Sequence, residues 1–152
     1  MCCDCRALNK ITVKNKYPIP LVADCFDRLS RANYFTKIYF RSGYLQVRIK
    51  EDDEAKTTVF TRYGAFKFLL MPFGLTNALA TFSILMNQVL HGFLDEVVVV
   101  YLDDIVVYSR TLVEHVDYLR QVLTRLLELY VKVSKCSFAW ETISFLGHIV
   151  ER

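Results

Sequence analysis

The stretch that decides the fold is Val97-Val98-Val99-Val100-Tyr101-Leu102-Asp103-Asp104-Ile105-Val106-Val107-Tyr108-Ser109. Two apolar, β-branched runs of strand length flank a pair of carboxylates, Asp103 and Asp104. Runs so uniformly apolar are typical of strands that are buried on both faces. Because aspartate favours turns, the sequence predicts a hairpin of two buried strands with both carboxylates where the chain reverses.

The two neighbouring carboxylates allow two interpretations. Close carboxylates repel and raise one another's pKa unless a cation lies between them. A magnesium ion binds one or two carboxylates together with the phosphates of a substrate, so the pair is consistent with a metal site for phosphoryl chemistry. A solvated hairpin tip explains the same two residues, and this stretch alone leaves both interpretations open.

The composition indicates a globular protein and sets few limits on its partners. A chain of 152 residues with 53% hydrophobic residues is long and apolar enough for one domain with a sizeable core. The formal charge of +3 permits a polyanionic partner without requiring one. No apolar run approaches the length of a membrane span, and we expect no insertion into a membrane.

The cysteines point to a reducing compartment. Their number is odd and their spacing forms no disulfide framework, so we expect free thiols in an intracellular protein, cytoplasmic or nuclear. The C-x-x-C between Cys2 and Cys5 lacks a second pair of ligands for zinc. The five cysteines are Cys2, Cys3, Cys5, Cys25 and Cys136.

Elements before the carboxylate pair are predicted from hydrophobic periodicity and turn residues. Leu21–Leu29 reads as a short helix, and Tyr34–Ile49 as two strands on either side of Arg41-Ser42-Gly43. The acidic run Glu51–Glu54 reads as a solvated turn. Thr57–Thr61 and Ala65–Leu70 are predicted as a hairpin, and Leu75–Phe93 as an amphipathic helix that Thr76 or Asn77 caps.

Elements after the pair complete the expected fold. Thr111-x-x-Glu114 is a capping box that opens a helix. Lys132–Cys136 reads as a short strand, and Ile143–Val150 as another that Gly147 interrupts. Helices do not alternate with every strand, so we predict an α+β domain: an antiparallel sheet with helices packed on one face. The apolar face of the last helix is predicted to be Val116, Leu119, Leu123, Leu126, Leu127 and Tyr130.

Seven short blocks occur along the chain in one order, and together they resemble a known family. That family is the reverse transcriptase of gypsy-type long-terminal-repeat retrotransposons, and the resemblance covers nearly the whole chain. The blocks are Asp4-Cys5-Arg6-Ala7-Leu8-Asn9, Tyr17-Pro18-Ile19-Pro20, Phe35-Thr36-Lys37, Arg41-Ser42-Gly43-Tyr44, Met71-Pro72-Phe73-Gly74-Leu75-Thr76-Asn77-Ala78, Tyr101-Leu102-Asp103-Asp104 and Phe145-Leu146-Gly147-His148.

The resemblance implies a fold, an activity and partners. The fold would be a right-hand polymerase palm with partial fingers, residues 1–152 forming a single domain that lacks the first part of the fingers, the thumb and RNase H. The activity would be that of an RNA-directed DNA polymerase with two magnesium or manganese ions. The partners would be an RNA or DNA template–primer, deoxynucleotides and the rest of a retrotransposon polyprotein.

One position departs from the family in a way that bears on catalysis. Asp103 and Asp104 match two of the three metal-binding aspartates, but Tyr39 stands where the third belongs. A neutral phenol, with a pKa near ~10, is a poor ligand for magnesium. We therefore expect weak binding of Mg²⁺ or Mn²⁺ and a catalytically inactive copy.

Further residues match functional positions of the family. Tyr44 matches the aromatic residue under the nucleotide sugar, Phe73 and Gly74 match the turn beside the incoming base, and Arg6 matches a fingers position near the nucleotide. Core packing, a structural turn and a surface charge explain these residues equally simply. The hairpin that grips the primer is matched by Phe145, Leu146, Gly147 and His148.

Two other functions compete with that of a polymerase fragment. The first is a non-catalytic nucleic-acid-binding remnant, which a primer-extension assay distinguishes from an active enzyme. The second is an unrelated metal-dependent phosphotransferase on a similar sheet. The seven blocks in register argue against the phosphotransferase.

Overall fold

The computed structural model describes residues 4–127 and 129–151. The chain divides into two compact units: unit 1 is Met1–Tyr17 with Ser42–Phe82, and unit 2 is Pro18–Arg41 with Ser83–Arg152. None of the described helices is long and apolar enough to span a membrane. In order, the elements are α1 (Arg6–Ile11), α2 (Val22–Leu29), β1 (Tyr34–Ile38), η1 (Gly43–Gln46), α3 (Glu51–Glu54), η2 (Ala55–Thr57), β2 (Val59–Thr61), β3 (Gly64–Phe66), α4 (Ala78–Val89), β4 (Val98–Tyr101), β5 (Asp104–Ser109), α5 (Leu112–Arg125), η3 (Val133–Lys135), β6 (Ser137–Trp140), β7 (Thr142–Phe145) and β8 (His148–Glu151).

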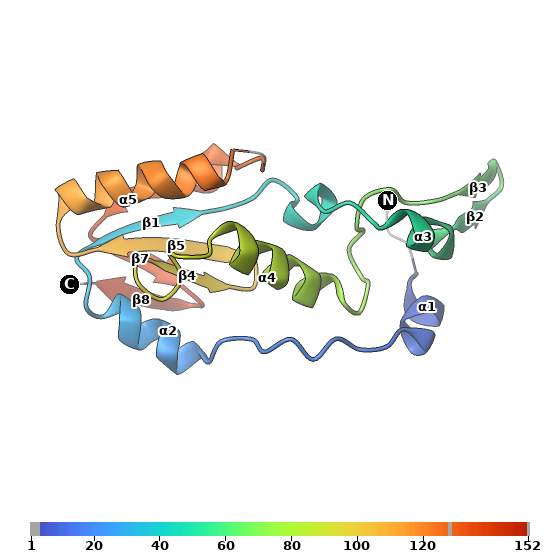
Figure 1. Ribbon diagram of the computed structural model, residues 1–152, viewed down its shortest axis with the longest axis horizontal. Helices are drawn as coiled ribbons and strands as arrows, with labels where there is room; N and C mark the ends of the chain where they lie inside the picture. The colour runs from blue at the N-terminus through green and yellow to red at the C-terminus, as the bar shows by residue number, and fades with distance from the viewer. Residues whose placement is uncertain (1–3, 128, 152) are drawn as a thin grey trace. The chain divides into compact units, whose positions relative to one another are not determined.

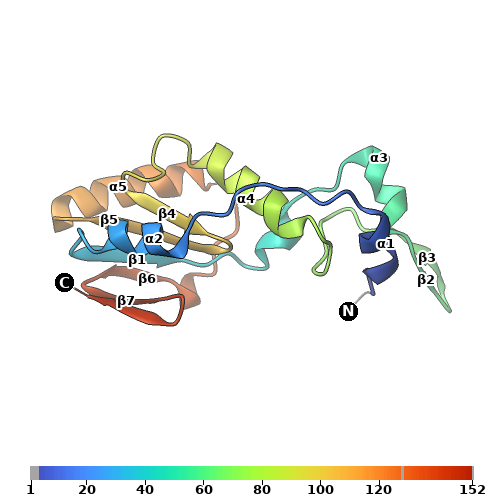
Figure 2. The same ribbon diagram turned by 90° about the horizontal axis from the view of Figure 1, so that it is seen from below.

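Unit 2 is built on an antiparallel sheet with the strand order β4-β5-β1-β6. The predicted hairpin is confirmed: β4 pairs with β5, and Tyr101 lies opposite Asp104, which leaves a two-residue turn. Leu102 opens that turn at a φ of 58°, a left-handed conformation that is unfavourable for a branched side chain. β1 lies between β5 and β6, so both of its edges are paired (Figure 2).

The main apolar core of unit 2 lies on the face of the sheet that carries Phe35 and Val106. Because side chains alternate along a strand, these two residues share a face with Tyr108 and Val99. α2 and the β7–β8 hairpin cover this face, whereas α5 lies on the opposite side of β1 and β5 (Figure 1). The cluster consists of Cys25, Leu29, Ala32, Phe35, Val99, Val106, Tyr108, Ile143, Phe145 and Val150.

The opposite face of the sheet holds a buried histidine. His115, in the first turn of α5, is fully buried between the hydroxyl groups of Thr36 on β1 and Ser109 on β5. The predicted capping box precedes it, and the side chain of Thr111 accepts a hydrogen bond from the backbone N–H of Glu114. The predicted α+β class with an antiparallel sheet is confirmed, but the helices do not share one face as predicted. α5 lies on one face and α2 on the other.

The predicted apolar face of α5 is correct only in part. Leu126 is buried and Leu119 and Leu123 are half-buried, as predicted. Val116, Leu127 and Tyr130 are exposed instead, and His115 and Val122 are the buried residues of the helix. The two strands supply hydroxyl partners for an imidazole, so a polar residue takes a core position and the helix is rotated relative to the prediction.

Unit 1 contains the predicted β2–β3 hairpin, shorter than expected and with Arg62-Tyr63 as its turn. The predicted strand after Gly43 is wrong, because the N–H of Leu45 donates to Ser42 and the N–H of Val47 donates to Tyr44 in the 3-10 helix η1. Local hydrogen bonds thus replace a strand partner over Gly43–Gln46, whereas Arg48 forms an isolated antiparallel bridge with Leu70.

Two further segments of unit 1 depart from the prediction. Glu51–Glu54 forms the one-turn helix α3, where carboxylates near a helix N-terminus are favourable, and not a solvated turn. Glu54 is buried, and its carboxylate accepts a hydrogen bond from Lys67 at 2.6 Å. α4 is shorter at both ends than the predicted Leu75–Phe93. It begins at Ala78, directly after Asn77, one of the two predicted caps, and ends at Val89. The side chain of Asn77 donates to the carbonyl of Val13 and accepts from the N–H of Asn15.

The C-terminal strands also differ from the prediction. Lys132–Cys136 is not a strand: it contains the 3-10 helix η3, and the strand β6 follows it. Ile143–Val150 is not one interrupted strand but part of the β7–β8 hairpin, with Phe145 opposite His148. The turn residues Leu146 and Gly147 both have positive φ, as a tight two-residue hairpin turn requires.

Candidate functional site

The two predicted catalytic carboxylates lie at the end of the β4–β5 hairpin. Asp103 is in the turn and is exposed, whereas Asp104 is the first residue of β5 and its side chain is 17% exposed. The valine-rich strands on either side are buried, so the hairpin holds this pair of carboxylates at the edge of a rigid sheet.

Tyr39 lies on the same face of the sheet as Asp104. The register pairs Ile38 with Ile105, so the next positions along the two strands, Tyr39 and Asp104, are cross-strand neighbours. The backbone of Tyr39 is held by its N–H, which donates to Cys136 Sγ at 3.3 Å, and by its carbonyl, which accepts from Lys132 at 2.7 Å. Continued by one residue, this register directs position 39 to the side of the sheet that carries Asp104.

Lys37 joins this pair, and sequence reasoning did not assign it a role. Its ammonium group lies 3.0 Å from Asp104 Oδ2, donates to the carbonyl oxygen of Ser144 at 3.1 Å and lies 4.9 Å from the centre of the Tyr39 ring. Two signals were available: Lys37 belongs to the block Phe35-Thr36-Lys37 that the resemblance includes, and it precedes Tyr39 by two residues, which places both on one face of an extended chain.

The surroundings keep Lys37 charged although its side chain is only 10% exposed. Burial by itself lowers the pKa of Lys37, but the hydrogen bonds to Tyr39 and Asp104 and the charge of Asp104 outweigh it. The pKa of Lys37 therefore lies above its ordinary value. A positive charge beside the carboxylate is a permanent feature of this site at neutral pH.

The residues present do not fit a two-metal centre. A two-metal site needs several hard oxygen ligands around a shared space. In residues 4–127 and 129–151, no group of three or more His, Cys, Asp or Glu side chains is placed to hold a metal ion. Asp104 is already engaged by an ammonium group, and the third position offers a phenol.

The predicted nucleotide-binding residues lie in unit 1. The ring of Tyr44 packs edge-on against those of Phe73 and Phe82, with 5.3 Å between centroids in each case. Gly74 has a φ of 98°, and its carbonyl accepts a hydrogen bond from the side chain of Asn9 at 2.7 Å. Tyr44, Phe73 and Gly74 are thus parts of a packed aromatic corner and its supporting turn.

Arg6, the fourth predicted nucleotide-binding residue, is exposed on α1. Its guanidinium donates to both carboxylate oxygens of Asp4, with a shortest distance of 2.6 Å. An exposed pair of this kind contributes little to stability and leaves Arg6 accessible from solvent.

The predicted primer-grip residues form the turn of the β7–β8 hairpin and its first pair. Phe145 is fully buried and packs 5.6 Å from Phe26, so it is a core residue rather than a contact surface. His148 and Gly147 are exposed, and the imidazole of His148 rests edge-on against Phe26 at 5.3 Å.

A carboxylate pair in the turn of a buried hairpin, on an antiparallel α+β sheet, defines a polymerase-type palm. Residues 1–150 match the family described as reverse transcriptase (RNA-dependent DNA polymerase), and the chain belongs to this family.

Relatives and solved structures agree with this assignment. The chain is 64% identical over 125 residues to an RNA-directed DNA polymerase homolog of Oenothera berteroana, covering 80% of this chain and 88% of that protein. It is 40% identical to the Pol polyprotein of transposon 297 of Drosophila melanogaster, covering 97% of this chain and only 14% of the polyprotein. The foamy viral protease–reverse transcriptase in complex with an RNA/DNA hybrid superposes with a TM-score of 0.87 at 25% identity, over 97% of this chain and 20% of that one.

Proposed function

We propose that this chain is the fingers–palm part of a gypsy-type retrotransposon reverse transcriptase, in a copy that no longer polymerises DNA. The observation that carries this proposal is the tyrosine at position 39, which follows the Ile38–Ile105 pair at the Asp104 end of β5, near the Lys37 ammonium group that also contacts Asp104. A carboxylate at position 39 would help hold two metal ions beside Asp103 and Asp104. A phenol cannot replace it at neutral pH.

The loss of that ligand bears on the rate of the chemical step. In a two-metal reaction, one ion activates the attacking hydroxyl and the other stabilises the leaving group. Removal of a shared carboxylate should cost several kcal/mol of transition-state stabilisation, roughly a thousandfold or more in rate. Magnesium or manganese would bind weakly to the two remaining carboxylates.

Nucleic-acid binding without catalysis is the second candidate function, and the charge distribution favours it. Unit 1 contains nine Lys and Arg residues against five Asp and Glu residues, whereas unit 2 contains ten against eleven. The net positive charge of the chain is thus concentrated in unit 1. A cavity of about 760 Å³ in this unit is lined by Arg48, Lys50 and Lys56 and also by Asp53, which pairs with Lys56.

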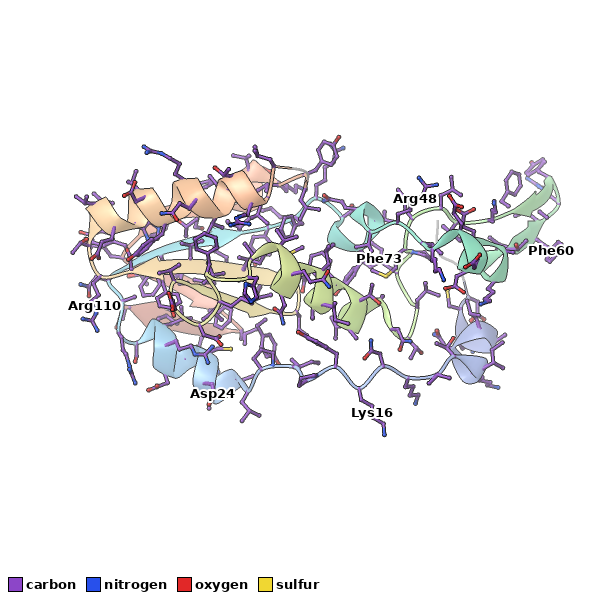
Figure 3. All side chains as sticks on the ribbon, viewed as in Figure 1. Lys16, Asp24, Arg48, Phe60, Phe73 and Arg110 are labelled. Carbon is purple, nitrogen blue, oxygen red and sulfur yellow. The ribbon has the colours of Figure 1, made fainter. Side chains whose placement is uncertain are left out.

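The β2–β3 hairpin of unit 1 adds exposed aromatic rings. Phe60 is 84% exposed and Tyr63 is 76% exposed (Figure 3 labels Phe60). The guanidinium of Arg62 stacks over the ring of Tyr63 at 4.7 Å. Exposed rings beside an arginine are typical of surfaces on which unpaired bases stack.

We expect single-stranded RNA or DNA to bind weakly, without sequence preference, and with a shallow dependence on salt. Few phosphate contacts are available, so few counterions are released. The measurement is fluorescence anisotropy of a labelled oligonucleotide between about 50 and 200 mM salt. Tyr63→Ala should weaken binding by about 1–3 kcal/mol if one base stacks there.

The matched control for this experiment is Trp140→Ala, which removes an exposed aromatic side chain from unit 2. It should leave the affinity unchanged. The same protein should show no primer extension with Mg²⁺ or Mn²⁺. Extension that Asp103→Ala abolishes would contradict the proposed inactivity, and equal affinities of all three proteins would remove the hairpin from the binding surface.

Replacement of Tyr39 by aspartate should tighten the binding of divalent ions. The substitution places a third carboxylate opposite Asp104, and three close carboxylates repel one another unless a cation joins them. An ion that binds only the folded state stabilises it by mass action. In thermal melts across a manganese titration, we expect a larger rise in melting temperature for Tyr39→Asp than for the wild type.

The control is Tyr39→Asn, which has the same size as the aspartate variant and no charge. It should respond to manganese like the wild type. If Tyr39→Asp and Tyr39→Asn gave equal shifts, the side chain at position 39 would not contribute to an ion site, and the proposed loss of metal binding through Tyr39 would fail.

A further inference from the structure

The helix α5 of unit 2 carries an apolar stripe that the sheet leaves partly uncovered. Leu112 is 47% exposed and Val116 is 50% exposed, while Leu119 and Leu123 are half-buried. Leu127, just after the end of the helix, is 79% exposed. These five residues follow one another at intervals of four, three, four and four positions, so they lie along one side of the helix.

Such a stripe is the kind of surface that a second helix covers. Apolar residues at alternating intervals of three and four positions are typical of helices that pack side by side. Covering them removes apolar surface from water, which is favourable. The charges beside the stripe indicate which helix would fit.

Two opposite charges lie at the middle of the exposed margin of the stripe. Arg120 Nη1 is 3.8 Å from Asp117 Oδ1, and the side chains of Arg120 and Asp117 are 75% and 69% exposed. An ion pair as exposed as this contributes little to stability. Either side chain can therefore change its partner at small cost.

The order of these charges makes α5 complementary to a reversed copy of itself. In an antiparallel pair of identical helices, the same margin of both helices meets in opposite directions. A two-fold axis beside Leu119 places Val116 of each copy near Leu123 of the other. The same axis brings Asp117 level with the partner's Arg120 to within the rise of one residue, about 1.5 Å.

We propose that the stripe of α5 is a homodimer interface, in which two copies of this chain pair their α5 helices antiparallel about a two-fold axis. Unit 2 contains ten Lys and Arg residues against eleven Asp and Glu residues, so two copies of it repel each other little. One pair of helices is smaller than a standard interface, so the dimer is weak. This inference is independent of whether the chain polymerises DNA or binds nucleic acid.

Sedimentation equilibrium of the whole chain tests the dimer. Val116→Lys places a charge in the apolar stripe and should weaken the dimer at least about tenfold, because the charge would be buried without a partner. Gln121→Lys is the matched control: Gln121 is exposed and lies about 140° around the helix from Val116, so the same charge there should have no effect.

Two results of this experiment would overturn the inference. A wild-type protein that is still monomeric at about 0.5 mM would leave the stripe to some other partner. A dimer that Val116→Lys does not weaken would use another surface. Both substitutions are at exposed positions, and circular dichroism should show unchanged helix content in each variant.

Exchanging the charges tests the pairing of Asp117 with the partner's Arg120. Asp117→Arg and Arg120→Asp each bring like charges together and should weaken the dimer by about threefold or more. An equimolar mixture of the two variants restores opposite charges at both contacts and should associate more tightly than either variant alone. A mixture that associates no more tightly would overturn the proposed pairing.

A photocrosslink tests the antiparallel direction without disturbing the stripe. Val113 is 82% exposed beside it and can be replaced by p-benzoylphenylalanine. Trypsin cleaves after Arg120, which puts the two ends of α5 on different peptides. Covalent dimers should join residue 113 to a peptide within residues 121–132 of the other copy. Dimers joined only through residues 111–120, or no covalent dimer, would overturn the inference.

Discussion

Replacement of Phe35 by alanine is expected to lower the free energy of unfolding by about 3–5 kcal/mol. Phe35 is fully buried on the central strand β1, opposite Tyr108 on β5, and belongs to the main core of unit 2. Its truncation removes buried apolar surface and leaves a cavity where α2, the sheet and the β7–β8 hairpin meet. The loss is a large part of the stability of a typical domain. Urea unfolding followed by circular dichroism measures it.

The control for this prediction is Phe138→Ala on the neighbouring strand β6. Phe138 is 38% exposed, so the same truncation removes less buried surface and should cost about 1 kcal/mol. If the two variants lost the same stability, the assignment of Phe35 to the core would be wrong.

Acid is expected to destabilise the protein through His115. The hydroxyl of Ser109 donates to the carbonyl of Thr111, so Ser109 Oγ accepts from His115 Nδ1 at 3.0 Å. The other ring nitrogen accepts from Thr36 at 2.7 Å. A neutral imidazole satisfies both contacts, whereas a second proton would oppose the donor of Thr36.

The sign of the pH effect follows from burial. Burial lowers the pKa of His115 below its ordinary value near 6.5. Above that value both states are neutral and stability does not depend on this residue. As the pH falls below it, His115 becomes protonated in the unfolded chain but stays neutral in the folded chain. The free energy of unfolding therefore decreases until the pH reaches the lower pKa of the folded state.

The measurement is a series of urea unfolding curves between about pH 7 and 5, the range in which an unfolded histidine titrates. His115→Gln keeps a donor and an acceptor without a titrating ring and should flatten the decline. His91→Gln changes an exposed histidine and should leave the decline unchanged. A His115→Gln profile as steep as that of the wild type would show that other groups cause the acid sensitivity.

Local sequence patterns predicted the elements whose hydrogen bonds join residues close together in the sequence. The hairpin around Asp103 and Asp104 was predictable because uniform valine runs have no stable alternative to a buried strand. The start of α5 was predictable because a capping box satisfies its own backbone donors. Tyr39 could be singled out because it departs from a short block whose other residues agree with the family.

The remaining errors of prediction concern residues whose conformation or burial depends on contacts with segments far away in the sequence. The alternation of Leu45, Val47 and Ile49 indicates a strand, but Leu45 lies in the 3-10 helix η1, and only the segment from Val47 to Ile49 pairs with residues 69–71. His115 has a core position only because Thr36 and Ser109 present hydroxyls from other elements. Lys37 forms an ion pair with Asp104 and a hydrogen bond with the carbonyl of Ser144, and the sequence around residue 37 does not predict either contact.

The central place of β1 has a consequence for the folding kinetics of unit 2. β1 lies early in the sequence, but both of its neighbouring strands lie much later. The N–H of Ala139 donates to the hydroxyl of Thr36, a hydrogen bond between residues 103 positions apart. Closing such long loops precedes most of the stabilising contacts, so folding should be slow compared with that of a helical protein of this size. Until β5 and β6 arrive, β1 presents two open edges, and an intermediate with open edges readily pairs with another copy. The yield of folded protein should therefore depend on concentration during refolding, even though the finished sheet covers the strand on both sides.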